Sequence, residues 1–338
     1  MWRAASNTDS LRPQLHPVTP GTTRVQTRLR IGTRGSALAL TQTRMVIAAL
    51  ARAHDWSPAE AEANTEVIVI KTTGDQVQDR SLADIGGKGL FAKEIEEALL
   101  RGTIDCAVHS LKDMPAVLPP GLIMACHLPR EDPRDAFISK TAANLGELPQ
   151  GAVVGTSSVR RRAILSNKRP DLKLVTFRGN VDTRLNKIAS GEAAATILAL
   201  AGLKRLGVEA HARHVFSTQE MLPAVAQGAI GIEARGNDAP TLDLLAPCNH
   251  RDTELAVTLE RAFLAALDGS CKTPIGGLAQ RRDAATFDFS GCVLTPDGRT
   301  RFDVARTATV TNAKEAEAVG LDAGRDLLAR AGRIFFEV

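Results

Sequence analysis

The residues best suited to chemistry lie between Asp105 and Pro115, in the stretch Asp-Cys-Ala-Val-His-Ser-Leu-Lys-Asp-Met-Pro. Its apolar start is typical of a strand covered on both faces of a sheet, and Pro115 stops any regular continuation. At the predicted strand end stand His109, Ser110, Lys112 and Asp113. Ligands bind beyond the carboxyl ends of strands in open α/β sheets, so the stretch predicts a site for a charged, polar ligand. Asp113 could stabilise a cation that develops during a reaction, whereas a surface turn with a Lys-Asp pair is the alternative.

Two later turns carry small polar residues and arginines, a pattern typical of anion binding. Gly155–Ser158 follows a short apolar strand and precedes a helix predicted over 159–168, and residues 178–184 follow a strand predicted over 172–177. Backbone N–H groups at helix N-termini favour anions. Nearby arginines are Arg160, Arg161, Arg162, Arg169, Arg178 and Arg184. Because Arg160 and Arg161 point about 100° apart on a regular helix, we expect them to contact different ligand groups; a solvated basic helix is the alternative.

The N-terminal part of the folded chain repeats this arrangement. A strand over 30–32 leads through Thr33-Arg34-Gly35-Ser36 to a helix over 37–54, which places Arg34 and Ser36 beside a helix N-terminus. Ser36 also fits a plain N-cap. The β-branched run 67–70 predicts a strand buried on both faces. Residues 76–89 contain a glycine cluster without phosphate-loop spacing, and we expect them to form a mobile lid.

Cys271 differs from the other cysteines of the chain. The five cysteines are odd in number, widely spaced and without a Cys-x-x-Cys pair, which argues against a disulfide framework or a zinc site. Cys271 lies in a glycine-rich loop next to Lys272, where a thiolate would be stabilised and accessible. The sequence therefore predicts a reactive thiol there and no metal, with an ordinary loop cysteine as the alternative.

Composition excludes several classes of protein. With 44% hydrophobic and 24% charged residues, the chain is typical of a soluble globular protein, and its 338 residues predict two or three domains. The longest apolar stretch, 193–203, is too short to cross a bilayer. Only 4% of residues are aromatic and none is tyrosine, so a base-stacking platform for nucleic acid is not expected. Small carboxylated or phosphorylated ligands fit the arginines better.

Changes in pattern along the chain predict its organisation. A polar crossing with two prolines spans 128–135, strand character returns at 222–233, and the last part combines helices over 252–267 and 313–331 with alternating strands around an Asp297-Gly298 turn. We therefore expect an N-terminal extension over 1–28, domain 1 over 29–130 with 226–246, domain 2 over 131–225 and domain 3 over 247–338. For the extension, a disordered tail or an over-long start is preferred to an organellar transit peptide.

Taken together, these motifs closely resemble the porphobilinogen deaminase family, also called hydroxymethylbilane synthase. The matching stretches run in order from about Leu29 and are Arg30–Ser36 with Leu38-Ala39-Leu40, Lys71–Asp75, Lys88–Phe91, Asp105–Pro115, Arg130–Asp135, Gly155–Ser158 with Arg160-Arg161, Arg178-Gly179-Asn180 with Thr183-Arg184, and Leu222–Val225. Two positions depart from the family pattern. Gly269-Ser270-Cys271-Lys272-Thr273-Pro274 replaces the more common Gly-Gly-Cys followed by a neutral residue and Val-Pro, and Ala226 replaces a common glycine.

The resemblance implies a fold and a reaction. The fold is α/β, with two type II periplasmic-binding-protein-like α/β domains around a hinged cleft and a small C-terminal α+β domain. The reaction joins four porphobilinogen molecules head to tail with loss of ammonia, and water releases hydroxymethylbilane. A dipyrromethane cofactor is tied by a thioether to the position of Cys271, and no metal is needed.

The resemblance also implies roles for single residues. Asp113 is the expected catalytic group, because a fixed carboxylate can stabilise the cationic azafulvene left when ammonia departs and can assist proton transfer. The expected cofactor-binding residues are Cys271, Ser110, Lys112, Asp113, Thr156, Ser158, Arg160 and Arg161. The expected substrate-binding residues are Arg34, Ser36, Arg178, Arg184 and Arg205, because arginines pair with the acetate and propionate groups of each pyrrole.

Two other classes of protein compete with this prediction. A binding-only protein would use the same cleft without a reactive cysteine and usually with a secretion signal, and a nucleic-acid-binding module would show steeply salt-dependent binding. Residues 1–28 lack an apolar signal core, and the thiol is present. We therefore expect a cytoplasmic, monomeric enzyme that binds porphobilinogen and neither nucleic acid nor membrane.

Overall fold

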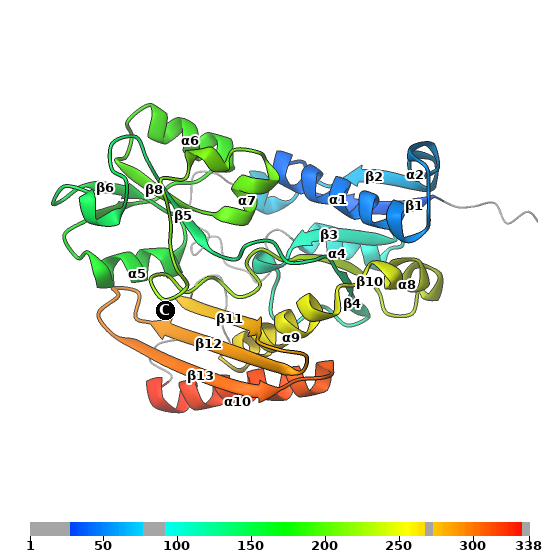
Figure 1. Cartoon of the computed structure of the whole chain (residues 1–338). Coiled ribbons are helices and arrows are strands. Elements are labelled where there is room, and N and C mark those ends of the chain that lie inside the picture. The colour runs from blue at the N-terminus through cyan, green and yellow to red at the C-terminus, as the bar shows by residue number, and fades with distance from the viewer. Residues whose placement is uncertain (1–27, 77–91, 268–272, 333–338) are drawn as a thin grey trace, which may run out of the picture.

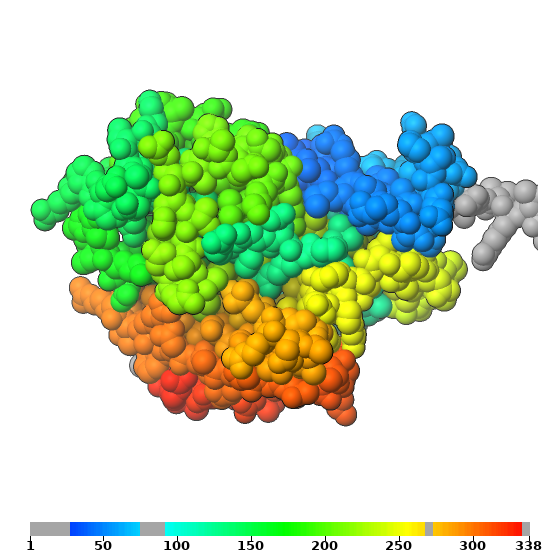
Figure 2. Space-filling view, viewed as in Figure 1, coloured from blue at the N-terminus to red at the C-terminus, as the bar shows by residue number. Residues whose placement is uncertain are grey.

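The computed structural model describes residues 28–76, 92–267 and 273–332. Figure 1 shows two α/β lobes side by side and a third unit, an antiparallel sheet with helices, packed below them. We call these the first lobe, the second lobe and the C-terminal unit. In the space-filling view of Figure 2 the C-terminal unit touches both lobes. No helix in the described ranges is long and apolar enough to cross a membrane.

The first lobe is built on a five-stranded sheet with the order β2-β1-β3-β10-β4. Its strands are β1 (Leu29–Thr33), β2 (Thr65–Val69), β3 (Cys106–Ser110), β4 (Leu122–His127) and β10 (Ile230–Arg235). Its helices are α1 (Ala37–Ala53), α2 (Pro58–Asn64), α3 (Thr73–Gln76), α4 (Lys93–Leu100) and α8 (Ala239–Leu245). Because β1 runs parallel to β3, the carboxyl ends of these two strands meet at one edge of the sheet.

Local signals explain the start of the first lobe. The Ser36 side chain accepts a hydrogen bond from the Ala39 N–H and caps α1, as predicted. Val46 and Leu50 of α1 pack with Ile31 of β1 in the core. Burial of this apolar face, more than helix propensity, fixes α1 on the sheet.

The prediction that the β-branched run 67–70 is buried on both faces is wrong. β2 lies at the edge of the sheet, and the side chains of Val67 and Val69 are 41% and 51% exposed. A β-branched run favours a strand wherever the strand lies. Burial depends on the order of strands, which this pattern does not contain.

The second lobe repeats the topology of the first. Its sheet has the order β7-β6-β8-β5-β9, and β6 runs parallel to both neighbours while β5 is antiparallel to both of its own. The strands are β5 (Asp135–Ser139), β6 (Val153–Gly155), β7 (Lys173–Val175), β8 (Ala195–Ala199) and β9 (His214–Val215), and the helices are α5 (Val159–Lys168), α6 (Val181–Ala189) and α7 (Leu200–Arg205). Two α/β lobes of this kind confirm the predicted fold class.

The chain returns to the first lobe through β10. This strand lies between β3 and β4 and pairs antiparallel with both. It begins at Ile230, so the predicted strand character over 222–233 holds only for its end, and the preceding residues are irregular with a turn over 225–228. Ala226 in this turn has a φ of 58°, a left-handed conformation that explains why glycine would suit this position. The domain boundaries given above stay predictions.

The C-terminal unit is a three-stranded antiparallel sheet with two helices. Strands β11 (Ile275–Arg281), β12 (Thr286–Leu294) and β13 (Arg301–Thr309) form the sheet, and α9 (Arg251–Ala266) packs against α10 (Ala313–Ala331). A Cβ on Gly320 of α10 would lie 2.1 Å from the Leu259 carbonyl oxygen of α9, so glycine is needed where the helices meet. The Asp297-Gly298 turn is present, whereas β11 was not predicted.

A buried carboxylate joins the three parts at their junction. Glu260 of α9 is fully buried and accepts hydrogen bonds from the Arg130 guanidinium at 2.6 and 3.2 Å. It also accepts from the backbone N–H groups of Ala226 and Ala279 at 2.6 and 2.8 Å. Removing one partner of such a group would leave a buried charge unpaired, so this junction favours one arrangement of the three parts.

Candidate active site

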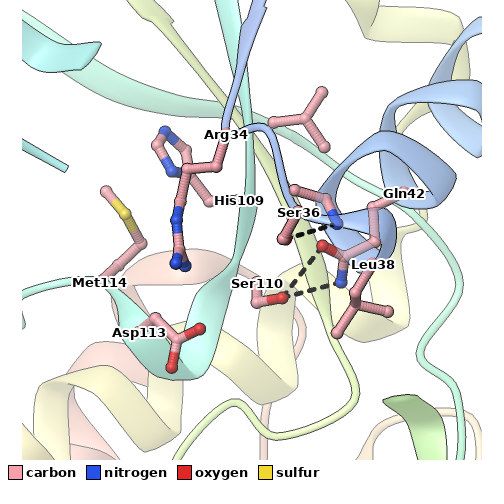
Figure 3. Close-up of a pocket in the computed structure, with 10 residues that line it drawn as sticks. Arg34, Ser36, Leu38, Gln42, His109, Ser110, Asp113 and Met114 are labelled. Carbon is pink, nitrogen blue, oxygen red and sulfur yellow. Dashed lines mark hydrogen bonds between the residues drawn. The ribbon is translucent and has the colours of Figure 1, made fainter. Parts of the chain in front are cut away.

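A pocket lies in the first lobe where β1 and β3 end (Figure 3). Its lining residues are Arg34, Ser36, Leu38, Ala39, Gln42, Val108, His109, Ser110, Asp113 and Met114. The loop after β1, the start of α1 and the turn after β3 therefore meet here. The structure brings together Arg34, Ser36, Ser110 and Asp113, which the sequence predicted from separate motifs.

Asp113 ends a short 3-10 helix, η1 (Leu111–Asp113), that directly follows β3. The buried Leu111 side chain anchors this turn in the core that it shares with the C-terminal unit, and the Met114 N–H donates to the Leu111 carbonyl at 3.2 Å. In Figure 3 the Arg34 side chain extends from the end of β1 toward the side of the pocket that holds Asp113 and Met114. A carboxylate and a guanidinium thus face one pocket, as a ligand with both positive and negative groups requires.

Gln42 is a site residue that the sequence analysis missed. It lies on α1, is 2% exposed, and its side-chain amide exchanges hydrogen bonds with the Ser110 hydroxyl at 2.8 and 3.0 Å. This contact fixes the Ser110 side chain at the pocket wall (Figure 3). A buried polar side chain on an alanine-rich helix is the signal that could have found it.

His109 lies inside β3 and not in the turn after it. Its Nε2 atom is 3.0 Å from the Glu233 carboxylate of β10, and both side chains are buried. His109 and Glu233 therefore form a buried pair behind the pocket. Glu233 was also missed, because its partner lies 124 positions away in the sequence.

Lys112 faces charged groups from the second lobe. Its pKa is lowered to about 8, chiefly by burial; Arg161 and Arg184 act in the same direction, while Asp113 and Asp135 act against it. Burial likewise lowers the pKa of Arg184 to about 10, and Asp113 acts against this. Since Lys112 and Asp113 belong to the first lobe and Arg184 to the second, the charges of the two lobes meet at the site.

The second lobe presents two capped helix N-termini to the site. Ser158 caps α5 by accepting from the Arg161 N–H at 3.3 Å, and the buried Thr156 hydroxyl accepts from the Ser158 N–H at 3.2 Å. Asn180 caps α6 in the same way, accepting from the Thr183 N–H at 2.8 Å. These caps keep both turns in the predicted conformation.

Arg160 and Arg161 bind one carboxylate of the protein together, which the geometry of a regular helix did not predict; their contacts with a ligand stay a prediction. Both guanidinium groups bind one carboxylate, that of the fully buried Asp135, at 2.7 and 2.6 Å. Burial alone would raise the pKa of Asp135, yet the two arginines hold it well below its usual range. Long side chains let two residues that point apart converge on one partner. The two cations still exceed the one anion, so this cluster leaves a positive charge.

Not every arginine of the basic segment is available to a ligand. Arg169 pairs with Asp171, and Arg162 donates to the Leu174 carbonyl at 3.0 Å. Arg205 donates to the Gly228 carbonyl at 2.6 Å, in the segment that returns to the first lobe. Arg205, which lies outside the basic segment, therefore uses one nitrogen at the crossing between the lobes, while its buried Nε atom has no hydrogen-bond partner among the described residues.

Several polar atoms of the site fit an anionic group. The Nε atoms of Arg184 and Arg205 are buried and have no hydrogen-bond partner within the described part of the chain. Buried donors normally have partners, so such atoms are the ones that the carboxylates of a ligand would satisfy. Among the described residues, no group of His, Cys, Asp and Glu could hold a metal ion.

The fold and the site define a two-lobed α/β protein with a carboxylate and several basic side chains gathered where the lobes meet. Comparison with known proteins identifies its family. Residues 29–243 match the model for "Porphobilinogen deaminase, dipyromethane cofactor binding domain", and residues 254–329 match that for "Porphobilinogen deaminase, C-terminal domain". The chain belongs to the porphobilinogen deaminase family.

Similar proteins come from plants and bacteria. The chain is 52% identical over 309 residues to the chloroplastic porphobilinogen deaminase of Oryza sativa subsp. japonica, covering 91% of this chain and 86% of that protein. It is 54% identical over 312 residues to the porphobilinogen deaminase of Paracoccus denitrificans (strain Pd 1222), covering 92% and 97%. Among solved structures it resembles a periplasmic substrate-binding protein of an ABC transporter from Coxiella burnetii, with a TM-score of 0.41, 13% identity and coverage of 65% and 91%.

Two predictions lie outside the described residues. Cys271, the expected attachment point of the cofactor, belongs to the segment 268–272, and most of the predicted lid, 76–89, belongs to the segment 77–91. Their roles stay predictions.

Proposed function

We propose that the chain joins four porphobilinogen molecules head to tail, with loss of ammonia, and releases hydroxymethylbilane. Membership of the family makes the chain a transferase of tetrapyrrole biosynthesis with a dipyrromethane-binding domain. The observation that carries the proposal is the position of Asp113, a carboxylate in a pocket shared with Arg34 and facing Arg184 of the opposite lobe.

The substrate is held by its carboxylates. Arg34 and Ser36 lie at the pocket, beside the N-terminus of α1, where backbone N–H groups favour an anion. Arg178, Arg184 and Arg205 approach from the second lobe and the crossing between the lobes. Charge-assisted hydrogen bonds from a guanidinium are about twice as strong as neutral ones, so these residues orient the acetate and propionate groups.

The cofactor is held by a second set of residues and is tied to Cys271. When bound, the dipyrromethane supplies the pyrrole end to which substrate units are added. Its carboxylates are bound by Ser110, Lys112, Thr156 and Ser158, supported by the excess positive charge of Arg160 and Arg161 over Asp135. Ser110 is fixed for this role by Gln42.

Asp113 performs the catalysis. Departure of ammonia from the aminomethyl group leaves a positive charge on the substrate pyrrole, and a carboxylate already in place stabilises that charge without reorganisation. The same carboxylate can accept and return a proton of the pyrrole N–H. Lys112 and Arg184 lie within electrostatic reach of this carboxylate, so the charges around the reacting centre are fixed by both lobes.

We also propose that the enzyme works as a monomer in the cytoplasm and without nucleic acid. The basic residues of the site are directed to small carboxylates, and the chain has few aromatic residues on which bases could stack. Sedimentation of the purified protein checks the monomer, and a filter-binding assay with duplex and single-stranded DNA checks the lack of nucleic-acid binding.

Two experiments test the proposal. The intact mass of the protein should exceed that of its sequence by one dipyrrole, and this excess should be absent from Cys271→Ser. Asp113→Asn keeps the shape of the side chain and should lower turnover of porphobilinogen by at least ~10²-fold, the usual scale for a positioned acid–base group, without changing the melting temperature. Near-normal turnover of Asp113→Asn would show that another group carries the chemistry.

A further inference from the structure

Arg261 connects the C-terminal unit to the turn that carries Asp113. It lies on α9, and its Nη2 atom donates to the backbone carbonyls of Pro115 at 2.7 Å and Ala116 at 3.1 Å. These two residues follow Asp113 by two and three positions. A single nitrogen atom of one unit therefore holds the backbone directly after the catalytic carboxylate of another.

Few other hydrogen bonds restrain this backbone. Between described residues, Met114 N–H donates to Leu111 and Leu122 N–H to Pro119, and both bonds lie within the turn itself. The Val117 side chain is 75% exposed and adds little packing. Within the described part of the chain, the hydrogen bonds that join the backbone of residues 115–118 to another unit are the two from Arg261.

The charge of Arg261 is also matched to its surroundings. Burial lowers its pKa, and the carboxylate of Glu233 on β10 acts in the opposite direction. Glu233 is fully buried; one of its oxygens contacts His109 of β3, and the other has no hydrogen-bond partner in the described ranges. Arg261 therefore offsets a buried negative charge beside the strand that leads to Asp113, which makes its own burial tolerable.

We propose that Arg261 is a positioning residue for Asp113. By holding the carbonyls of Pro115 and Ala116, it fixes the turn after β3 on α9, so that the carboxylate keeps its place in the pocket through successive additions. This inference rests on the proposed function of Asp113. Displacing a catalytic group by about 1 Å can cost ~10²-fold in rate, so a loosened turn should slow the chemistry more than it weakens binding.

Three variants test the inference. Arg261→Met keeps the length of the side chain without a donor and should lower kcat at least ~10-fold while KM changes less than about threefold, because the carboxylate-binding arginines are untouched. Arg261→Lys places one donor nitrogen near both carbonyls and should recover most of the lost rate. Arg251→Met is the matched control: Arg251 lies on the same helix, is half-exposed and pairs with Glu254, so kcat should not change.

A second readout does not depend on catalysis. Amide hydrogen exchange of residues 111–118 should be faster in Arg261→Met than in the parent or in Arg251→Met. This difference is expected even if none of the proteins turns over porphobilinogen. Absence of turnover in the parent would refute the proposed function and not the role of Arg261. Unchanged exchange, a kcat within twofold of the parent, or a lysine variant as slow as the methionine variant would each overturn the role of Arg261. Should Arg261→Met fail to fold, Arg261→Gln, whose amide is too short to reach both carbonyls, replaces it with the same expected results.

Discussion

Replacing Asp135 by asparagine tests how the second lobe keeps two adjacent arginines buried. The Asp135 carboxylate accepts hydrogen bonds from Arg160, Arg161 and the side-chain amide of Gln227, and none of its surface is exposed. Asparagine has nearly the same shape and keeps one acceptor oxygen. The change therefore removes the negative charge while leaving two buried cations in place.

The expected loss is large because the remaining charges cannot reach water. Arg160 and Arg161 are 3% and 5% exposed. Breaking a buried ion pair by removing one partner costs about 3–5 kcal/mol, whereas exposed pairs are worth far less. Asp135→Asn should therefore lower the free energy of unfolding by about 3–5 kcal/mol. Adding Arg161→Met should recover part of this loss, since it removes one of the two buried charges left without a partner.

Urea unfolding at pH 7, followed by circular dichroism, measures this loss. Asp171→Asn is the control, because the Asp171–Arg169 pair is partly exposed. The urea midpoint of this variant should stay close to that of the parent. The folded-state pKa of Asp135 lies below its usual value, so its contribution is present above pH ~4 and is lost only as the pH falls further. A loss under about 1 kcal/mol, or one that disappears by pH 5, would refute the reasoning.

Two further substitutions have definite expected outcomes. Because burial lowers the pKa of Lys112 to about 8, the lysine loses its charge as the pH rises through 8, and kcat/KM should fall there. In Lys112→Arg the side chain stays charged, so this fall should move to higher pH. Identical pH profiles for the two proteins would contradict the role of Lys112. Ala226→Gly removes the strain of a left-handed φ, which should stabilise the fold by about 1–2 kcal/mol. It also removes a buried methyl group and makes the unfolded chain more flexible, and these two losses together are of similar size. The free energy of unfolding should therefore change by less than ~0.5 kcal/mol. Ala229 is buried and has no left-handed φ, so Ala229→Gly loses the methyl group and the chain order without relieving strain; it should lower the free energy of unfolding in urea by about 1.5 kcal/mol. Equal losses of stability at both positions would contradict the argument.

Elements with local signals were predicted well from the sequence. Helices α5 and α10 begin and end where the pattern placed them, and Ser36 caps α1 as expected. Capping residues and helical periodicity act within one or two turns, so a single sequence contains them. Arg34, Ser36, Ser110 and Asp113 of the pocket were found for the same reason, because polar turns after apolar strands are local patterns.

Long-range pairings could not be predicted in this way. Asp135 was read as the end of a polar crossing, and nothing near it in the sequence shows that its partners lie 25 and 26 positions further along. Glu233, Glu260 and Arg261 were missed because each has a partner more than 100 positions away: His109, Arg130 and Pro115, respectively. The exposure of Val67 and Val69 depends on strand order, which is also a property of the whole chain.

The position of β10 has a consequence for how the protein is made. Because β10 lies between β3 and β4, the first sheet lacks one of its inner strands until the ribosome has synthesised residues 230–235. The second lobe has all five of its strands between residues 135 and 215 and is complete earlier. During translation all the strands of the second sheet are therefore available before those of the first, and the N-terminal segment is completed only when β10 arrives.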